Sequence, residues 1–187
     1  MWTDYNYLSI LESELIPALG CTEPIAIAYA SAKARAVLGE FPEHLDLFCS
    51  GNIVKNVKGV TVPNSGGLKG IDVAGALGTV CGADQQELEV LEQATPADVE
   101  KALQLIAEGF VHCHLAEGVE NLYIRALATA GPHSAEVTIV DYHTFISEIR
   151  KDGKLLLQQS SIGGSKPDKK TLSVAGILDY ADTVPVE

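Results

Sequence analysis

The stretch ALGCTEP, residues 18–24, places Cys21 directly before the expected start of a helix. A thiol at a helix N-terminus faces the positive end of the helix dipole and several free backbone N–H groups, and both stabilise the thiolate. The thiolate is the form of cysteine that attacks electrophiles or binds metals. Buried cysteines also serve as small apolar side chains. The sequence therefore leaves three roles open for Cys21: nucleophile, metal ligand or packing residue.

A second candidate region is CSGNIVKNVKGVTVPNSGG, residues 49–67, which is rich in small polar and basic side chains. Such side chains recognise the carboxylate and the amino group of a small zwitterion, so we predict substrate contacts here. The region matches no phosphate-binding fingerprint. A plain strand, turn and strand is the alternative. The four predicted contacts are Ser50, Asn52, Lys55 and Asn56.

The histidines are weaker candidates. The run His112–Cys113–His114 looks like a metal cluster, but in a strand the two histidines share one face and Cys113 points to the other. We therefore predict a structural or surface role for this run. His133 and His143 could each act as a base, yet neither has a partner that the sequence reveals, and there is no GxSxG motif of a serine hydrolase.

Composition narrows the class of protein. The 187 residues are 47% hydrophobic and 20% charged, as in ordinary globular proteins. The net charge of −12 argues against binding of nucleic acid or an anionic membrane. No stretch approaches the ~20 apolar residues of a membrane span. The four scattered cysteines, Cys21, Cys49, Cys81 and Cys113, form no disulfide framework and predict a reduced, cytoplasmic protein.

Helices are predicted wherever apolar residues recur at helical spacing. Thr22 is the expected N-cap of the alanine-rich helix, and Gly39 is expected to end it. Thr95 and Pro96 mark the start of another helix. The predicted helices cover residues 4–15, 24–38, 71–82, 87–91 and 95–110, with a further one starting near residue 172.

Strands are predicted from alternating patterns at residues 45–50 and 57–63, followed by a loop at 64–70. Three or four antiparallel strands are expected between residues 111 and 160, with a hairpin turn at Lys151–Gly153. These elements predict an α+β fold in which N-terminal helices pack on a mixed or antiparallel sheet. We expect an α+β domain over residues 1–160, and a linker with the start of a helical half over 161–187.

Three segments are familiar as a set: ALGCTEPIAIAYASAKA, SGNIVKNVKGVTVPNSGGLKGI and LEVLEQATPADVEKAL. Together they resemble the N-terminal half of the L-cysteine desulfidase family, serine-dehydratase-like proteins related to the iron–sulfur L-serine dehydratases. The resemblance extends over residues 12–156. It implies an α+β fold like the β domain of those dehydratases, which is similar to the allosteric substrate-binding domain of some phosphoglycerate dehydrogenases.

The resemblance also implies a cofactor and a reaction. It makes Cys21 a ligand of a [4Fe–4S] cluster whose other cysteine ligands lie in the absent C-terminal half, so this chain alone is expected to hold no intact cluster. The implied reaction is α,β-elimination, converting L-cysteine to pyruvate, ammonia and sulfide, or L-serine to pyruvate and ammonia. The expected partners are that C-terminal half and a second copy in a homodimer. An amino-acid-binding regulatory module or a dimerisation module without catalysis is the alternative.

Overall fold

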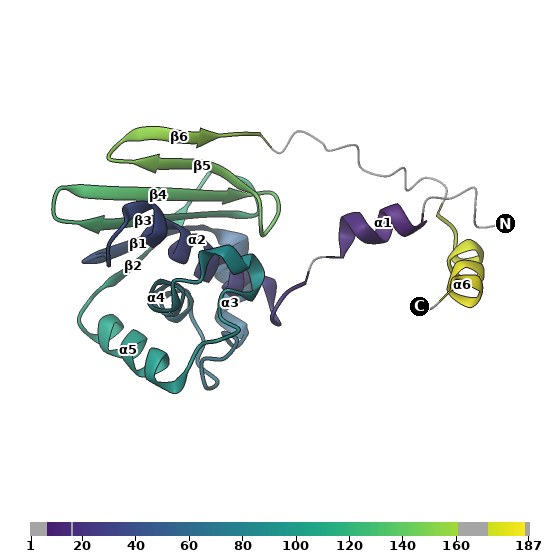
Figure 1. Ribbon diagram of the computed structural model, residues 1–187, viewed down its shortest axis with the longest axis horizontal. Helices are drawn as coiled ribbons and strands as arrows, with labels where there is room; N and C mark the ends of the chain where they lie inside the picture. Colours follow the sequence, from purple (N-terminus) through teal and green to yellow (C-terminus); the bar gives the residue numbers. More distant parts are fainter. Residues whose placement is uncertain (1–6, 16, 161–171, 186–187) are drawn as a thin grey trace. The chain divides into compact units, whose positions relative to one another are not determined.

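A computed structural model describes residues 7–15, 17–160 and 172–185 (Figure 1). The chain divides into two compact units, one of residues 18–161 and one of residues 1–17 with 162–187. The fold is α+β, with helices and a six-stranded mixed sheet, which confirms the predicted class. No helix within the described ranges is long and apolar enough to cross a membrane.

The sheet has the strand order β2-β1-β3-β4-β5-β6. β1 and β2 are parallel, whereas all other neighbours are antiparallel. The prediction of antiparallel strands after residue 110 is therefore wrong for β2, because the chain reaches it through a helical crossover. The strands are β1 (His44–Ser50), β2 (Val111–Ala116), β3 (Tyr123–Ala130), β4 (His133–Val140), β5 (Ile146–Lys151) and β6 (Lys154–Gln158).

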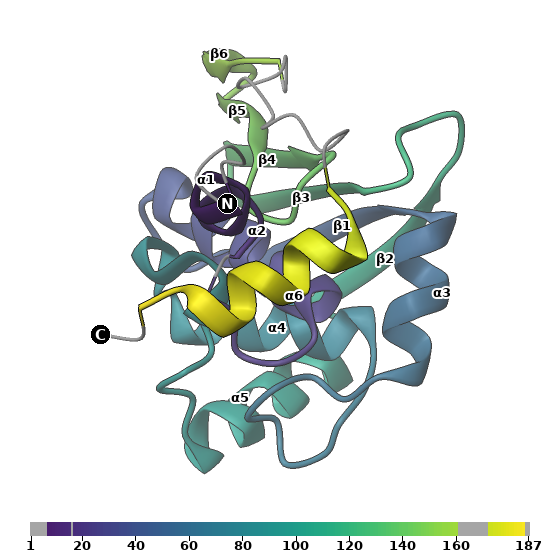
Figure 2. The ribbon, with the colours of Figure 1, turned by 90° about the vertical axis from the view of Figure 1, so that its right-hand side faces the viewer.

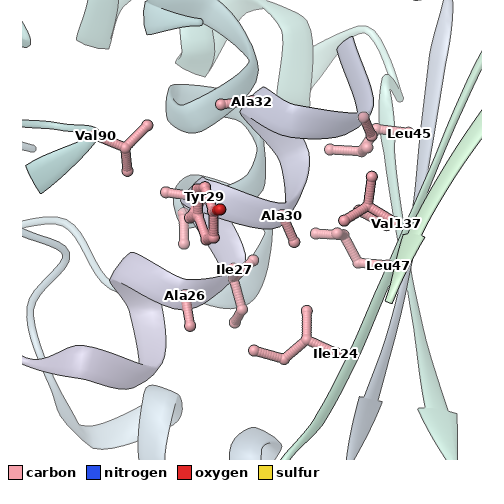
Figure 3. Packing of buried hydrophobic residues seen from close by; sticks show 14 of the residues in the cluster. Ala26, Ile27, Tyr29, Ala30, Ala32, Leu45, Leu47, Val90, Ile124 and Val137 are labelled. Carbon is pink, nitrogen blue, oxygen red and sulfur yellow. The ribbon is translucent and has the colours of Figure 1, made fainter. Parts of the chain in front are cut away.

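Two helices, α2 (Thr22–Leu38) and α4 (Ile71–Cys81), pack against each other and against one face of the sheet. Alternate strand residues point into this layer, as Figure 3 shows for Leu47, Ile124 and Val137 beneath α2. Outside this layer, α5 (Pro96–Ala107) packs on α4 on the side away from the sheet (Figure 2). Gly78 of α4 lies directly against the backbone of Ala28 in α2, so the two helices approach closely.

The boundaries of α2 differ from the prediction at one end. The helix begins at Thr22, and Cys21 occupies the N-cap position in an extended conformation without a side-chain capping bond. The prediction of Thr22 as N-cap is therefore wrong. Gly39 ends the helix in the left-handed conformation, with φ 89°, as predicted.

The segment predicted as a strand at residues 57–63 begins inside α3 (Gly51–Gly59), so that prediction is wrong. Ser50 caps this helix, since its Oγ accepts a hydrogen bond from the Ile53 N–H at 3.4 Å. Ile53 and Val57, one turn apart, are both buried. Burial of this helical pair outweighs the β-rich composition of the segment.

The remaining predictions around α5 hold. Thr95 and Asp98 form a capping box, and Pro96 is the first helical residue. The loop predicted at 64–70 is confirmed, whereas the helix predicted at 87–91 is replaced by a 3₁₀ segment, η2 (Asp84–Glu89). In place of a continuous helix, Glu87 adopts a left-handed φ of 46°.

The other unit contains α1 (Tyr7–Glu14) and α6 (Val174–Thr183). The rings of Tyr7 and Tyr180 stack with their centroids 5.0 Å apart. The presence of α6 confirms the helix predicted to start near residue 172. Most of the predicted linker lies outside the described residues, and the proposed division at residue 160 stays a prediction.

Candidate functional site

The thiol of Cys21 lies at the N-terminus of α2, partly exposed. It donates a hydrogen bond of 3.2 Å to Oε2 of Glu23, two residues further along the chain. Burial, followed by the hydrogen bond to this carboxylate, raises the pKa of Cys21 above its ordinary value. The expected stabilisation of the thiolate by the helix N-terminus is therefore overcome, and Cys21 is a protonated thiol near neutral pH.

Glu23 is the centre of this group. Its Oε2 accepts from the thiol and from the Thr22 hydroxyl at 3.4 Å, and its Oε1 accepts from Nδ2 of Asn56 at 3.1 Å. Burial alone would raise the pKa of Glu23, but the hydrogen bonds from Cys21, from the Glu23 backbone N–H and from Asn56, together with the nearby His143, lower it below its ordinary value. Glu23 is therefore a hydrogen-bonded carboxylate at neutral pH.

His143 joins the group from the turn between β4 and β5. Burial lowers the pKa of His143, and the interaction with the Glu23 carboxylate partly opposes that shift. At neutral pH this imidazole is mainly in its neutral form and is able to accept a proton. Glu23 is thus the charged residue that acts on His143, a relation that the sequence did not reveal.

The structure separates the four predicted substrate contacts. Asn56 belongs to the Glu23 group, and Asn52 is exposed one helical turn before it on α3. Lys55 is exposed on the same helix. Ser50 is only 4% exposed, and its hydroxyl donates to the Asn121 carbonyl oxygen at 2.6 Å. Ser50 therefore holds the junction of β1 and α3, and its hydroxyl is already engaged.

The donor set limits what metal the described part of the chain can hold. All four cysteines are free thiols, and Cys49 is fully buried in β1, where burial raises its pKa to about 12. Within residues 7–15, 17–160 and 172–185, no group of three or more His, Cys, Asp or Glu side chains is arranged to hold a metal ion. A [4Fe–4S] cluster takes several cysteine ligands. These residues alone therefore do not fit a cluster, and Cys21 would be a single ligand of one.

The HCH run behaves as predicted for a strand. His112 and His114 lie in register with Asp46 and Phe48 of β1, whereas Cys113 lies in register with the buried Leu47. His114 Nε2 is 2.6 Å from Asp46 Oδ1, and its ring stacks on Phe48. Both histidines thus take part in cross-strand contacts at the edge of the sheet.

Glu23 is the candidate site residue that sequence reasoning missed, because an acid in the first turn of a helix has a sufficient structural explanation. The available signal was its position two residues after Cys21 in CTEP, which brings a carboxylate to the thiol at the same helix end. The combination of thiol, carboxylate, amide and neutral imidazole can bind an ammonium group and accept a proton.

Related proteins align with nearly all residues of this chain. It is 45% identical over 182 residues to a UPF0597 protein of Lachnoclostridium phytofermentans, covering 96% of this chain and 44% of that protein. Over 186 residues it is 44% identical to a UPF0597 protein of Finegoldia magna, again 44% of that protein's length. No family model matches, and no solved structure shows a significant match. The chain is thus similar to UPF0597 proteins and spans less than half of their length.

Proposed function

We propose that this chain is the N-terminal part of a [4Fe–4S]-dependent lyase that carries out α,β-elimination on a small L-amino acid. The substrates would be L-cysteine, giving pyruvate, ammonia and sulfide, or L-serine, giving pyruvate and ammonia. The observation that carries the proposal is the hydrogen-bonded group of Cys21, Glu23 and Asn56. It joins two of the three segments on which the resemblance to the L-cysteine desulfidases rests.

In this proposal each residue of the group has its own task. Glu23 is an anion able to receive the ammonium group of an amino acid, and Asn56 fixes the orientation of its carboxylate. Neutral His143 is the group able to accept the proton from the substrate Cα, and the Glu23 charge would stabilise the imidazolium that forms. Cys21 would contribute one thiol to a cluster whose other ligands come from outside this chain.

The same proposal covers the type of domain, the oligomeric state and the cellular compartment. The α+β unit of residues 18–161 would correspond to the β domain of the iron–sulfur L-serine dehydratases. The complete enzyme would be a homodimer. It would be cytoplasmic, because an oxygen-sensitive cluster and four free thiols suit a reducing compartment.

The test uses the full-length protein, reconstituted with iron and sulfide without oxygen and assayed for pyruvate from L-cysteine and L-serine. We expect Cys21→Ala to lose both the visible absorbance of the cluster and the activity, whereas the matched control Cys113→Ala keeps both. His143→Gln should keep the absorbance and lose kcat. Absence of pyruvate formation, or an unchanged cluster in Cys21→Ala, would overturn the proposal.

A binding or dimerisation module without catalysis is the second candidate. It is favoured by the core of residues 18–161, which encloses its own hydrophobic cluster. Calorimetry of the 187-residue chain with L-serine and L-cysteine, and sedimentation of the same sample, distinguish the two functions. Saturable binding or stable dimers, together with a full-length protein that forms no pyruvate, would favour the module.

A further inference from the structure

Two short helices, α1 and α6, expose most of their apolar side chains. They contain 8 and 10 residues, and helices shorter than about 12 residues are marginal in water unless something packs against them. Tyr7 is the one large apolar side chain of the two helices that is buried, and no residue of α6 is buried. Six of the thirteen large hydrophobic side chains that the described residues expose lie in this unit, so the uncovered apolar surface is concentrated here. These six are Leu8, Leu11, Leu15, Val174, Ile177 and Leu178.

On α6 the exposed apolar side chains lie on one face. Val174, Ile177 and Leu178 follow the i, i+3 and i+4 spacing, and Ala181 continues the row one turn further on. The three larger side chains are between 47% and 76% exposed. A row with this spacing is the surface through which one helix packs on another. α6 therefore presents a packing face that the described residues leave largely uncovered.

α1 carries a second face of the same kind. Leu8, Leu11 and Leu15 follow the i, i+3 and i+7 spacing, and each is at least 40% exposed. The Leu15 N–H donates to the Leu11 carbonyl oxygen at 2.8 Å, so helical hydrogen bonding continues past the last residue of α1. The two helices contact each other where the ring of Tyr7 stacks on that of Tyr180. Both faces thus belong to one small helical unit.

The charges of this unit limit what can cover it. Among its described residues every charged side chain is acidic, namely Glu12, Glu14, Asp179 and Asp182. A second copy joined through the same faces would bring these like charges together, which disfavours self-association here. An anionic membrane would be repelled for the same reason. A partner with lysine or arginine beside its apolar side chains would be attracted.

The lengths of the relatives indicate where such a partner is found. This chain matches two UPF0597 relatives over only 44% of their own length, so more than half of each relative has no counterpart in these 187 residues. A segment of the same polypeptide binds at a high effective concentration, and a contact with two short helices is then sufficient. The comparison of lengths does not involve the reaction, so the inference does not rest on the proposed lyase function.

We propose that the apolar faces of α1 and α6 dock an amphipathic helical segment from the part of the full-length protein that this chain does not span. The segment packs its apolar side chains on the exposed leucines, isoleucine and valine of the two helices. Lysine or arginine residues at its margins pair with the acidic side chains of α1 and α6. The α1–α6 unit is thus an interface between two parts of one polypeptide.

The experiment compares the full-length protein with the 187-residue chain. Leu11→Cys and Leu178→Cys are alkylated with N-ethylmaleimide, and the rate at each position is followed by peptide-resolved mass spectrometry. We expect roughly tenfold slower alkylation in the full-length protein, because a docked thiol reacts only after local opening. Leu103→Cys, on the exposed side of α5, is the matched control and should react equally fast in both proteins. Equal rates at all three positions, or equal slowing at all three, would overturn the proposal.

A charge placed on the docking face sharpens the test. In the full-length protein Ile177→Asp should accelerate alkylation of Leu178→Cys toward its rate in the 187-residue chain. Ala175→Asp, outside the apolar row of α6, is the control and should leave the slow rate unchanged. Slow alkylation already in the 187-residue chain, or conversion of that chain from dimer to monomer by Ile177→Asp in sedimentation, would overturn the proposal. Alkylation is measured without any assay of pyruvate, so a failure here is distinguishable from failure of the lyase proposal.

Discussion

Asn56 of α3 donates a 3.1 Å hydrogen bond to Glu23 of α2, across 33 positions of the chain. This bond holds the carboxylate against the Cys21 thiol and ties together the two segments that contain the predicted site. Asn56 is thus a positioning residue for Glu23, in addition to any contact with substrate. The properties of the thiol consequently depend on a carboxylate that can be removed by a single substitution.

Replacing Glu23 with glutamine should make Cys21 more reactive. The carboxylate accepts a hydrogen bond from the thiol and repels the thiolate, so Glu23→Gln should lower the pKa of Cys21 toward its ordinary value. A lower pKa increases the fraction of Cys21 present as thiolate, and with it the rate of alkylation. Alkylation of Cys21 by iodoacetamide at pH 7.5, followed by peptide-resolved mass spectrometry, measures this change. Asp98→Asn on α5 is the control, and a slower reaction of Cys21 in Glu23→Gln would contradict the assigned cause.

His143 should make the protein less stable in mild acid. Its pKa in the folded state is lower than its ordinary value of about 6.5, so the unfolded chain binds the proton more readily. The corresponding stability is present above pH 6.5 and is lost as the pH falls below it. Urea unfolding at pH 7.5 and pH 5.5 should therefore show a smaller loss of stability in His143→Gln than in the native chain. His112→Gln, at an exposed position of β2, is the matched control for the loss of a histidine.

Gly78 should tolerate no side chain. A Cβ added there would meet the backbone of Ala28, with the Ala28 Cα only 2.5 Å away, and a backbone cannot move aside as a flexible side chain can. Gly78→Ala should reduce the free energy of unfolding by at least about 2 kcal/mol, despite the higher helix propensity of alanine. Gly59→Ala, at an open position at the end of α3, should leave stability within about 1 kcal/mol. Similar denaturation midpoints for the two variants would disprove the close approach of α2 and α4.

Ser50 should contribute mainly to the stability of the fold, rather than to contact with substrate. Ser50→Ala removes the N-cap of α3 and the partly buried hydrogen bond to the Asn121 carbonyl, which together should cost about 1–2 kcal/mol. The exposed Asn52→Ala should cost less than about 0.5 kcal/mol. Guanidinium denaturation of both variants measures the difference. If Ser50→Ala were as stable as the native chain, the structural role assigned to Ser50 would be wrong, and its hydroxyl would again be a candidate for contact with substrate.

Local signals predicted some elements well. The start of α5 is specified within four residues by Thr95, Pro96 and Asp98, so its prediction required nothing from the rest of the chain. By contrast, α3 is rich in β-branched residues and glycine, so its tertiary contacts decide whether the segment forms a helix or a strand. Ile53 and Val57 can bury one side of a helix because the core is present on that side.

The candidate site also combines a local relation, which the sequence predicts, with tertiary contacts, which it does not. Cys21 could be identified from its place before a helix, because that relation is local. Its contact with Asn56 through Glu23 could not be predicted, since β1 separates α2 from α3 in the sequence and the contact between them is tertiary. His143 was visible as a possible base, but Glu23, the carboxylate whose charge acts on it, lies 120 positions earlier in the sequence.

The parallel pairing of β1 with β2 has a consequence for how the chain folds. The meander β3–β6 needs only short turns, whose hairpins close within microseconds. β1 pairs with β2 across 66 positions of the sequence and with β3 across 75–85 positions, so both pairings are nonlocal. Because β2 is the edge strand, β1 is its one neighbour in the six-stranded sheet. We expect the backbone amides of β2 to gain protection from hydrogen exchange last during refolding and to lose it first in the native state.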